Sequence, residues 1–465
     1  MCSFGSLLAL RRGARAPGPS VGPAAGLWGR RGRAHSSFLG LGGVVPGPFS
    51  KRQSSAAASS AASSTPRPAP SQLASMVAGG GGRLHTAEHD DFRNTVRSFF
   101  AEHVVPFHSQ WEQDQGVPRE LWRKAAEYGL LGIAAPEEYG GLGCDVVFAS
   151  ILWEEQAYAR GACSGPGFWL HSDVVMPYII TYGTCEQKQK YLPKCISGEC
   201  ILAVAMTEPG AGSDLQGLTT KATKVEGGWL LNGAKTFITN GASADLVVVV
   251  ARTSMDKPAA HGTSLFLLES GTPGFTKAPP LHKLGQRAQD TCELFFEDVF
   301  VSEDALLGNL DGGFYALMNE LPQERLVLAV KDQALAEAAF EDCREWCNDR
   351  VAFGEPLIEK QVVGHKLANM KTKICANSSF VQDCLELHSI GQLDGSTASM
   401  AKVASSELAW FVCDEAVQLH GGAGYMWETA AARRLAEARV SRVWGGSNEI
   451  LYELISRGCR TKTRS

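Results

Sequence analysis

A glycine-rich segment, Met206-Thr-Glu-Pro-Gly-Ala-Gly-Ser-Asp214, carries the residues best suited to hold a cofactor. Glycines leave backbone N–H groups open, so such a loop can approach a phosphate or the polar edge of a planar ring, and Thr207 and Ser213 add hydroxyl donors. The pair Gly210-x-Gly212 is weak evidence for a nucleotide by itself, because a dinucleotide fingerprint has a third glycine and lies in a βαβ unit. No Gly-Lys-Ser/Thr follows, so the segment is not a P-loop either. We therefore expect a cofactor loop of another kind.

Charge, hydropathy and cysteine spacing exclude several classes of protein. The 465 residues have a formal net charge of −5, which argues against binding nucleic acid by neutralising its phosphates. No apolar run approaches the roughly 20 residues of a transmembrane helix. The 13 cysteines form no Cys-x-x-Cys pair, and His171, His365 and His420 have no partner at ligand spacing. We expect no metal site, and a reducing compartment.

Residues 1–83 differ in composition from the rest of the chain. Several arginines precede the first acidic residue, Glu88, and Ser, Ala and Leu lie between them. Such a basic, acid-free segment is typical of a mitochondrial transit peptide; the alternative is a tail without a targeting role. Residues 54–82 are rich in Ala, Ser, Pro and Gly and cannot bury enough apolar surface to fold. We therefore expect a mitochondrial matrix protein whose fold begins at about residue 84.

A helical domain over residues 84–203 is expected to precede the glycine-rich loop. Thr86 is suited to cap its first helix, and Glu88 and Asp90 favour the positive end of that helix. Further helices are predicted over 121–128, 146–159 and 187–196. Apolar side chains recur at helical spacing in the first helix, at Phe92, Val96, Phe99, Phe100 and Val104.

A β-domain is predicted over residues 204–308. Asn232-Gly233, between two apolar runs, is a typical two-residue hairpin turn because both positions accept positive φ. Proline and glycine between Gly271 and Pro280 predict loops. Short strands at this spacing indicate an antiparallel barrel or sandwich, not βαβ units. The other predicted strands are 246–250, 264–268 and 294–301.

Long helices return in the last part of the chain, over residues 309–465. They are predicted over 314–348, 359–393 and 396–419, and their short connections indicate a helical bundle. The expected fold is therefore α+β, in the order helical, β, helical.

From about residue 88 to residue 457 the chain resembles the acyl-CoA dehydrogenase family. The resemblance implies an amino-terminal helical domain, a small β-domain and a carboxy-terminal four-helix bundle, with FAD as the cofactor. This agrees with the order of elements derived above. The motifs that carry the resemblance are Met206–Asp214, Phe237-Ile-Thr-Asn-Gly241, Arg350-x-x-Phe-Gly354, Gln418-Leu-His-Gly-Gly422 and Gly445-Gly-Ser-Asn-Glu449.

The resemblance also implies which residues bind FAD. Thr207 and Thr239 would meet the flavin, and Phe237, where the family usually has Trp, would pack near its ring. Arg350 would reach FAD in a neighbouring subunit, because a planar guanidinium suits a pyrophosphate. The full set implied for FAD is Val204, Ala205, Met206, Thr207, Glu208, Pro209, Gly210, Ala211, Gly212, Ser213, Phe237, Ile238, Thr239, Arg350, Gln361, Gln418, Leu419, His420, Gly421, Gly422, Ser447, Asn448 and Glu449.

The resemblance assigns the catalytic base to Glu324. Most relatives have glutamate in the carboxy-terminal motif, where this chain has Gly445. The long-chain and isovaleryl branches instead carry glutamate on the helix after the β-domain, as this chain does. A thioester α-proton is weakly acidic, so a buried carboxylate with a raised pKa would remove it while hydrogen bonds stabilise the enolate oxygen. The alternative for Glu324 is an ion pair with Arg325. The set implied for the substrate is Ser213, Ala260, His261, Tyr315, Pro322, Gln323, Glu324, Arg325, Gly445 and Gly446.

Among the branches of the family, the long-chain branch is the one that several short sequence segments resemble most. Examples of these segments are Trp153–Tyr158, Ser164–Phe168 and Pro322–Arg325. Gly165-Pro166-Gly167 cannot hold a regular helix, and a distorted helix beside the acyl pocket would deepen that pocket. The expected reaction is α,β-dehydrogenation of a long-chain acyl-CoA to trans-2-enoyl-CoA, the first step of mitochondrial fatty acid β-oxidation, with the hydride passing to flavin N5.

The resemblance further implies electron-transferring flavoprotein as the electron acceptor and a homotetramer, arranged as a dimer of dimers. Two alternatives stay open: a branched short-chain enzyme of the isovaleryl-CoA type, and a non-catalytic flavoprotein that serves complex assembly. A peroxisomal acyl-CoA oxidase is disfavoured by the basic amino terminus and by the lack of a Ser-Lys-Leu ending.

Overall fold

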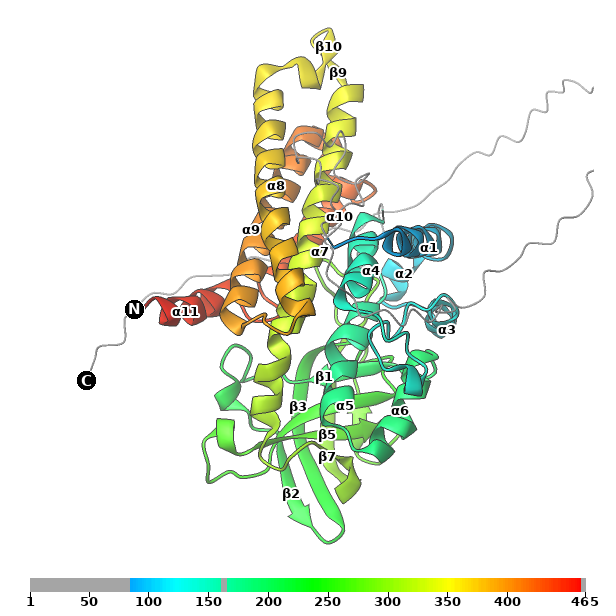
Figure 1. The fold of residues 1–465 in the computed structure, drawn as a ribbon, viewed down its shortest axis with the longest axis vertical. Helices are drawn as coiled ribbons and strands as arrows, with labels where there is room; N and C mark the ends of the chain where they lie inside the picture. Colours follow the sequence, from blue (N-terminus) through cyan, green and yellow to red (C-terminus); the bar gives the residue numbers. More distant parts are fainter. Residues whose placement is uncertain (1–83, 160–164, 461–465) are drawn as a thin grey trace, which may run out of the picture. The chain divides into compact units, whose positions relative to one another are not determined.

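The computed structural model describes residues 84–159 and 165–460, and the statements below concern these residues. The transit-peptide prediction for residues 1–83 lies outside them. The elements follow the predicted order, helical, then β, then helical (Figure 1). The predicted α+β fold class is therefore confirmed, whereas the boundaries 84–203, 204–308 and 309–465 stay predictions.

The amino-terminal helices begin where the sequence offers caps. Thr86 and His89 form a capping box at the start of α1, and the Asp145 carboxylate accepts hydrogen bonds from backbone N–H groups at the start of α4. Residues 165–167 are not helical, and the segment after them contains a π-helical turn, η3 (Leu170–Val175). The helices are α1 (Ala87–His103), α2 (His108–Asp114), α3 (Arg119–Glu127), α4 (Val146–Tyr158), α5 (Met176–Tyr182) and α6 (Cys185–Ile196).

The β-domain is one open sheet that packs as in a sandwich and does not close into a barrel. Its strands follow the order β6-β7-β3-β2-β4-β5-β8, and β1 pairs with β4. Most neighbours are antiparallel, as predicted, but β1 and β2 pair with β4 in parallel. The strands are β1 (Leu202–Ala205), β2 (Lys221–Val225), β3 (Gly228–Thr239), β4 (Leu246–Arg252), β5 (Thr263–Glu269), β6 (Phe275–Lys277), β7 (Thr291–Ser302) and β8 (Leu306–Leu307).

The predicted hairpin turn at Asn232-Gly233 is wrong. Strand β3 runs through both residues, and its pairing with β7 shifts register between Leu231 and Gly233, which marks a β-bulge. The Asn232 side chain bonds Asp298 across the strands. The tight turn lies between β2 and β3, where Val225 pairs with Gly228.

The predicted loop between Gly271 and Pro280 also needs correction. It contains the short strand β6, which pairs with β7 at the edge of the sheet.

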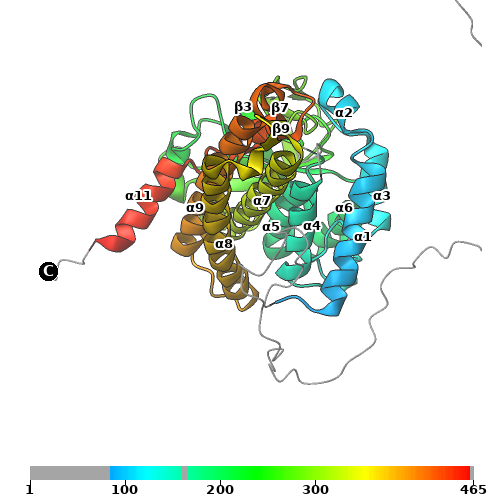
Figure 2. The same ribbon diagram turned by 90° about the horizontal axis from the view of Figure 1, so that it is seen from above.

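The three predicted long helices are confirmed as α7 (Gly313–Asp349), α8 (Gln361–Ser389) and α9 (Gly395–His420). Helix α7 reaches from the sheet to the hairpin of β9 (Val351–Ala352) and β10 (Glu355–Pro356) (Figure 1). Seen from above, α7, α8 and α9 lie side by side, and α4 packs next to α7 (Figure 2). Helix α10 (Ala430–Ser441) packs against α9 and α7 and completes the bundle. Helix α11 (Asn448–Cys459) contacts α9 and projects away from the bundle (Figure 1). No helix in residues 84–159 or 165–460 has the length and hydropathy of a membrane span.

Candidate active site

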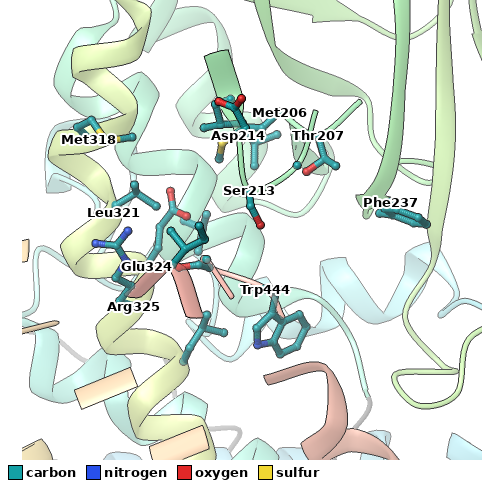
Figure 3. A pocket seen from close by; sticks show the side chains of 18 of the residues that line it. Met206, Thr207, Ser213, Asp214, Phe237, Met318, Leu321, Glu324, Arg325 and Trp444 are labelled. Atoms are coloured by element: carbon teal, nitrogen blue, oxygen red, sulfur yellow. Dashed lines mark hydrogen bonds between the residues drawn. The ribbon is translucent and has the colours of Figure 1, made fainter. Parts of the chain in front are cut away.

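A cavity of about 480 Å³ lies where the first turns of α7 face the glycine-rich loop (Figure 3). The rest of its wall comes from Trp169 and η3, the ends of β1 and β3, residues 214–216, the loop before α11, and α11 itself. Of the residues predicted from the sequence, those that line the cavity are Val204, Met206, Thr207, Gly212, Ser213, Phe237, Ile238, Thr239, Glu324, Arg325, Gly445 and Gly446.

A buried ion pair fixes the glycine-rich loop to β3. The Lys235 ammonium donates to the Glu208 carboxylate at 2.8 Å and to the Met206 carbonyl at 2.9 Å. The other Glu208 oxygen accepts from the backbone and the hydroxyl of Thr219. Burial alone would raise the pKa of Glu208, but the charge of Lys235 and these hydrogen bonds lower it to about 2. The Glu208 side chain therefore holds the loop in place. Because its carboxylate is already occupied by these contacts, Glu208 can offer a cofactor only its backbone groups.

The opposite face of this loop is open. A Cβ added at Gly210 would meet no atom within 4 Å, and one added at Gly212 would meet only Thr207, at 3.9 Å. Backbone N–H groups with free space beside them suit phosphate or the polar edge of a flavin.

Phe237 offers an exposed aromatic ring beside the cavity. It stands in the left-handed region, with φ of +59°, at a second register shift of β3, and 67 % of its surface is exposed. Such a conformation is rare for an aromatic residue and occurs where a strand redirects a side chain. An exposed ring next to an open glycine-rich loop fits a planar ligand such as the isoalloxazine of FAD.

Glu324 lies on the cavity wall and is almost completely buried. Figure 3 shows its side chain directed into the space between α7 and the glycine-rich loop. The Tyr178 hydroxyl donates to its carboxylate at 2.8 Å. Burial raises the pKa of Glu324 to about 7, although the Tyr178 hydrogen bond and the charge of Arg325 act in the opposite direction. A carboxyl group in this state can accept a proton near neutral pH.

Two cationic side chains hold the glycine pair Gly445-Gly446, which forms the cavity wall next to Glu324. Arg325 donates to the Gly445 carbonyl at 3.4 Å and to the Ser399 hydroxyl at 3.2 Å, so its guanidinium is directed toward this loop. The Lys402 ammonium donates to the Gly446 carbonyl at 2.8 Å. Gly445 has a φ of +64°, and a Cβ there would lie 2.5 Å from a Leu328 methyl group, so a larger residue would be strained and would require Leu328 to shift.

Another group of predicted residues lies at the far end of the bundle. Arg350 ends α7 and Gln361 begins α8, so both stand beside the β9–β10 hairpin. The segment 418–422, with Gln418, Leu419, His420, Gly421 and Gly422, ends α9. Along α7, Arg350 stands about 40 Å from Glu324. These residues cannot reach a ligand in the cavity of the same chain.

The remaining predicted residues have other contacts. Gln323 donates to the Asp173 carbonyl and bonds His388, so it is directed away from the cavity. Tyr315 and His261 bond each other at 3.2 Å. The others that do not line the cavity are Ala205, Pro209, Ala211, Ala260, Pro322, Ser447, Asn448 and Glu449.

Several cavity residues were not predicted. Leu321 and Leu328 stand at helical spacing on either side of Glu324, and this pattern alone could have found them. Trp169 and Trp444 carry no such signal, because they belong to segments far from α7 in the sequence. The same holds for Tyr178, which bonds Glu324 without lining the cavity.

Comparisons with known proteins find relatives for all three parts of the chain. Models of the acyl-CoA dehydrogenase N-terminal, middle and C-terminal domains match residues 86–199, 203–299 and 311–459. The chain is 53 % identical over 376 residues to the long-chain specific acyl-CoA dehydrogenase, mitochondrial, of Rattus norvegicus, covering 81 % of this chain and 87 % of that protein. It is 38 % identical over 368 residues to the isovaleryl-CoA dehydrogenase, mitochondrial, of Arabidopsis thaliana, covering 79 % of this chain and 90 % of that protein. The crystal structure of an acyl-CoA dehydrogenase from Geobacillus kaustophilus superposes with a TM-score of 0.80 at 43 % identity, covering 82 % of this chain and all of that one.

Proposed function

The chain belongs to the acyl-CoA dehydrogenase family, and on this premise we propose that it converts a fatty acyl-CoA to its trans-2-enoyl-CoA, with Glu324 as the base. One observation carries the proposal: a buried carboxyl group with a pKa of about 7 on the wall of the cavity that also collects the glycine-rich loop and Phe237.

Glu324 would remove the α-proton of the thioester. A base is most effective when its pKa lies near the working pH, since it is then ionised and still strong enough to accept a proton. The Tyr178 hydrogen bond fixes the direction of the carboxylate. The apolar side chains of Leu321 and Leu328 on either side exclude water from the reacting carbons.

FAD is the cofactor that the residues fit. Phe237, Thr239 and the loop from Met206 to Ser213 would hold the flavin part, and a neighbouring subunit would add Arg350. Bound FAD would supply the acceptor, flavin N5, for the hydride that leaves the β-carbon.

For the acyl group, the name of the rat relative supports a long-chain acyl-CoA, and the name of the plant relative makes isovaleryl-CoA the second candidate. Both names also support a mitochondrial location, and the matrix is our proposal. We further propose electron-transferring flavoprotein as the electron acceptor and a homotetramer as the working form.

The proposal is tested by anaerobic titration of the purified holoenzyme with acyl-CoAs of graded length and with isovaleryl-CoA. We expect the flavin absorbance to bleach with fatty acyl-CoA. In Glu324→Gln the flavin should stay bound, while the bleaching rate falls by roughly 10²–10⁴-fold, the usual contribution of a general base. A protein that binds flavin but bleaches with no acyl-CoA would instead be the non-catalytic flavoprotein. A Glu324→Gln variant that bleaches like the parent would refute the assignment of the base.

A further inference from the structure

Two tryptophans of the cavity wall pack against a buried lysine of α7. The Lys331 ammonium lies 3.9 Å from the ring centroid of Trp169 and 5.4 Å from that of Trp444. The two indole rings meet edge to face, with centroids 5.4 Å apart. Both tryptophans line the cavity, and Trp169 is only 4 % exposed. We refer to Trp169, Lys331 and Trp444 as the Trp–Lys–Trp stack.

The stack is held more firmly than an ordinary apolar wall. Lys331 is buried, so its charge has lost most contact with water and is attracted to the faces of the indole rings. Such a contact is worth about 2 kcal/mol when the cation is desolvated. Rotating either indole ring away would weaken the contact between the ring and the Lys331 ammonium. The two rings therefore form a wall that resists displacement.

The position of the stack relative to Glu324 follows from α7. One face of this helix lines the cavity from Met318, which is 38 % exposed, past Glu324 to Leu328, which is buried. Lys331 follows Leu328 at helical spacing on the same face. The cavity therefore has an open end near Met318 and a buried end at the stack.

A bound acyl-CoA can be oriented along this axis. The proposed reaction requires the α-carbon to lie at Glu324. The CoA part is polar and charged and belongs at the open end, whereas the apolar acyl tail gains by entering the buried end. The tail therefore points from Glu324 toward the Trp–Lys–Trp stack, over a rise along α7 of about 10 Å.

We propose that the Trp–Lys–Trp stack determines the length of acyl chain that the cavity accepts. This inference rests on the proposed function and adds to it the residues that set chain-length specificity. A saturated chain advances roughly 1.3 Å per carbon, given bonds of about 1.5 Å, so about eight carbons beyond the α-carbon span the available rise. A longer tail enters only where the indole rings move away from the lysine, so the stack sets how readily a long chain such as palmitoyl is accepted relative to octanoyl.

The test compares palmitoyl-CoA with octanoyl-CoA in the parent and in Trp169→Ala, both as holoenzymes. The measured quantity is the ratio of the two flavin-bleaching rates within one preparation, which does not depend on the fraction of active protein. We expect this ratio to rise about tenfold in Trp169→Ala, because the shortened side chain opens the buried end. The affinities for the corresponding trans-2-enoyl-CoAs, measured by equilibrium dialysis, should shift in the same direction without turnover.

Two further variants keep the test decisive if Trp169→Ala does not fold. Trp169→Phe keeps an aromatic ring of smaller size. Lys331→Met keeps the approximate length of the lysine side chain but removes its charge. Both variants should raise the palmitoyl-to-octanoyl ratio of bleaching rates by a smaller factor than Trp169→Ala does. Trp229→Phe is the matched control, because Trp229 packs against Phe266 in the β-domain, and it should leave the ratio unchanged.

The two proposals fail in different ways. Unchanged ratios in all stack variants of a bleaching enzyme would overturn the role of the stack and leave the dehydrogenase function intact. A parent holoenzyme that bleaches with neither of these substrates nor with isovaleryl-CoA would overturn the dehydrogenase function itself.

Discussion

The hydrogen bond between Tyr178 and Glu324 sets the pH range in which the proposed base can work. The hydrogen bond stabilises the ionised carboxylate and so lowers the pKa of Glu324, whereas burial raises it. The pKa that results from both effects is about 7. Removing the hydroxyl with Tyr178→Phe must therefore raise the pKa of Glu324 further. Because only the ionised form accepts a proton, the acid limb of the pH profile of kcat/KM should move to higher pH. A hydrogen bond to a charged group is worth about 1.5–3 kcal/mol, so we expect kcat/KM at pH 7 to fall about tenfold.

The control for this prediction is Tyr182→Phe. Tyr182 stands one turn further along α5, with its ring centroid 6.4 Å from that of Tyr178, and it does not line the cavity. The acid limb of the kcat/KM pH profile of Tyr182→Phe should therefore match that of the parent enzyme. An acid limb that stays in place in Tyr178→Phe would show that Tyr178 does not act on the base.

Single residues were predictable from the sequence only where a local motif carried them. The glycine-rich loop and Phe237 belong to contiguous motifs. Phe237 lines the cavity, and so do Met206, Thr207, Gly212 and Ser213 of the loop. The partner of Glu324 was not predictable, because Tyr178 is 146 residues away and only packing brings the two together. The same holds for Lys331, since a lone lysine on a long helix usually faces water and nothing local shows that Trp169 and Trp444 cover it.

Helix α9 positions the glycine pair at the cavity through one buried side chain. Lys402 donates to the Gly446 carbonyl and, at 2.9 Å, to the side chain of Asn448, the first residue of α11. Burial lowers the pKa of this lysine to about 8, despite the nearby Asp332 carboxylate. Lys402→Met would leave the Gly446 carbonyl without this donor and the Asn448 side-chain oxygen with only the longer hydrogen bond from the Ser406 hydroxyl, at 3.3 Å, at a cost of about 1–3 kcal/mol in the free energy of unfolding. The loosened glycine pair should also raise KM for the acyl-CoA several-fold.

Urea unfolding and steady-state kinetics measure these two effects separately. Lys221→Met is the matched control, because Lys221 is an exposed lysine of β2, outside the cavity, and its replacement should change neither quantity. If Lys402→Met loses stability but keeps the parental KM, the lysine supports the fold without positioning the cavity wall.

Strands show most clearly why local sequence signals are not sufficient. Asn232-Gly233 has the residue types of a tight turn, but the pair forms a bulge, because β7, which follows more than fifty residues later, pairs with both halves of β3. The long helices were predicted correctly because their apolar periodicity is repeated over many turns. The open edge of the sheet and the parallel pairing of β1 with β4 depend on contacts between distant segments and had no local signal.

The whole chain separates two groups of residues that the family resemblance assigns to one cofactor. Glu324 and Phe237 lie at the cavity, whereas Arg350 and the segment 418–422 lie at the far end of the bundle, about 40 Å away along α7. Phe353, at the tip of the β9–β10 hairpin, is 96 % exposed, as expected of a residue that is covered in an assembly. Both groups can serve one FAD only if the far end of one subunit reaches the cavity of another.

This arrangement predicts complementation between two inactive variants. Glu324→Gln removes the base and Arg350→Ala removes the contact to the neighbouring cofactor, so each homo-oligomer should have little activity. In a two-fold symmetric pair with one subunit of each kind, one site carries both defects and the other carries neither. Random co-assembly into pairs should therefore restore roughly a quarter of the parental activity per subunit, and pairs selected to contain one subunit of each kind should restore about half. Co-expression with two different affinity tags, tandem purification and the flavin-bleaching assay measure this restored activity.

Mixing the two purified homo-oligomers without exchange of subunits is the control and should restore no activity. If co-assembled oligomers are no more active than that mixture, Arg350 does not act across subunits, and each cavity has to hold its cofactor with the residues of its own chain.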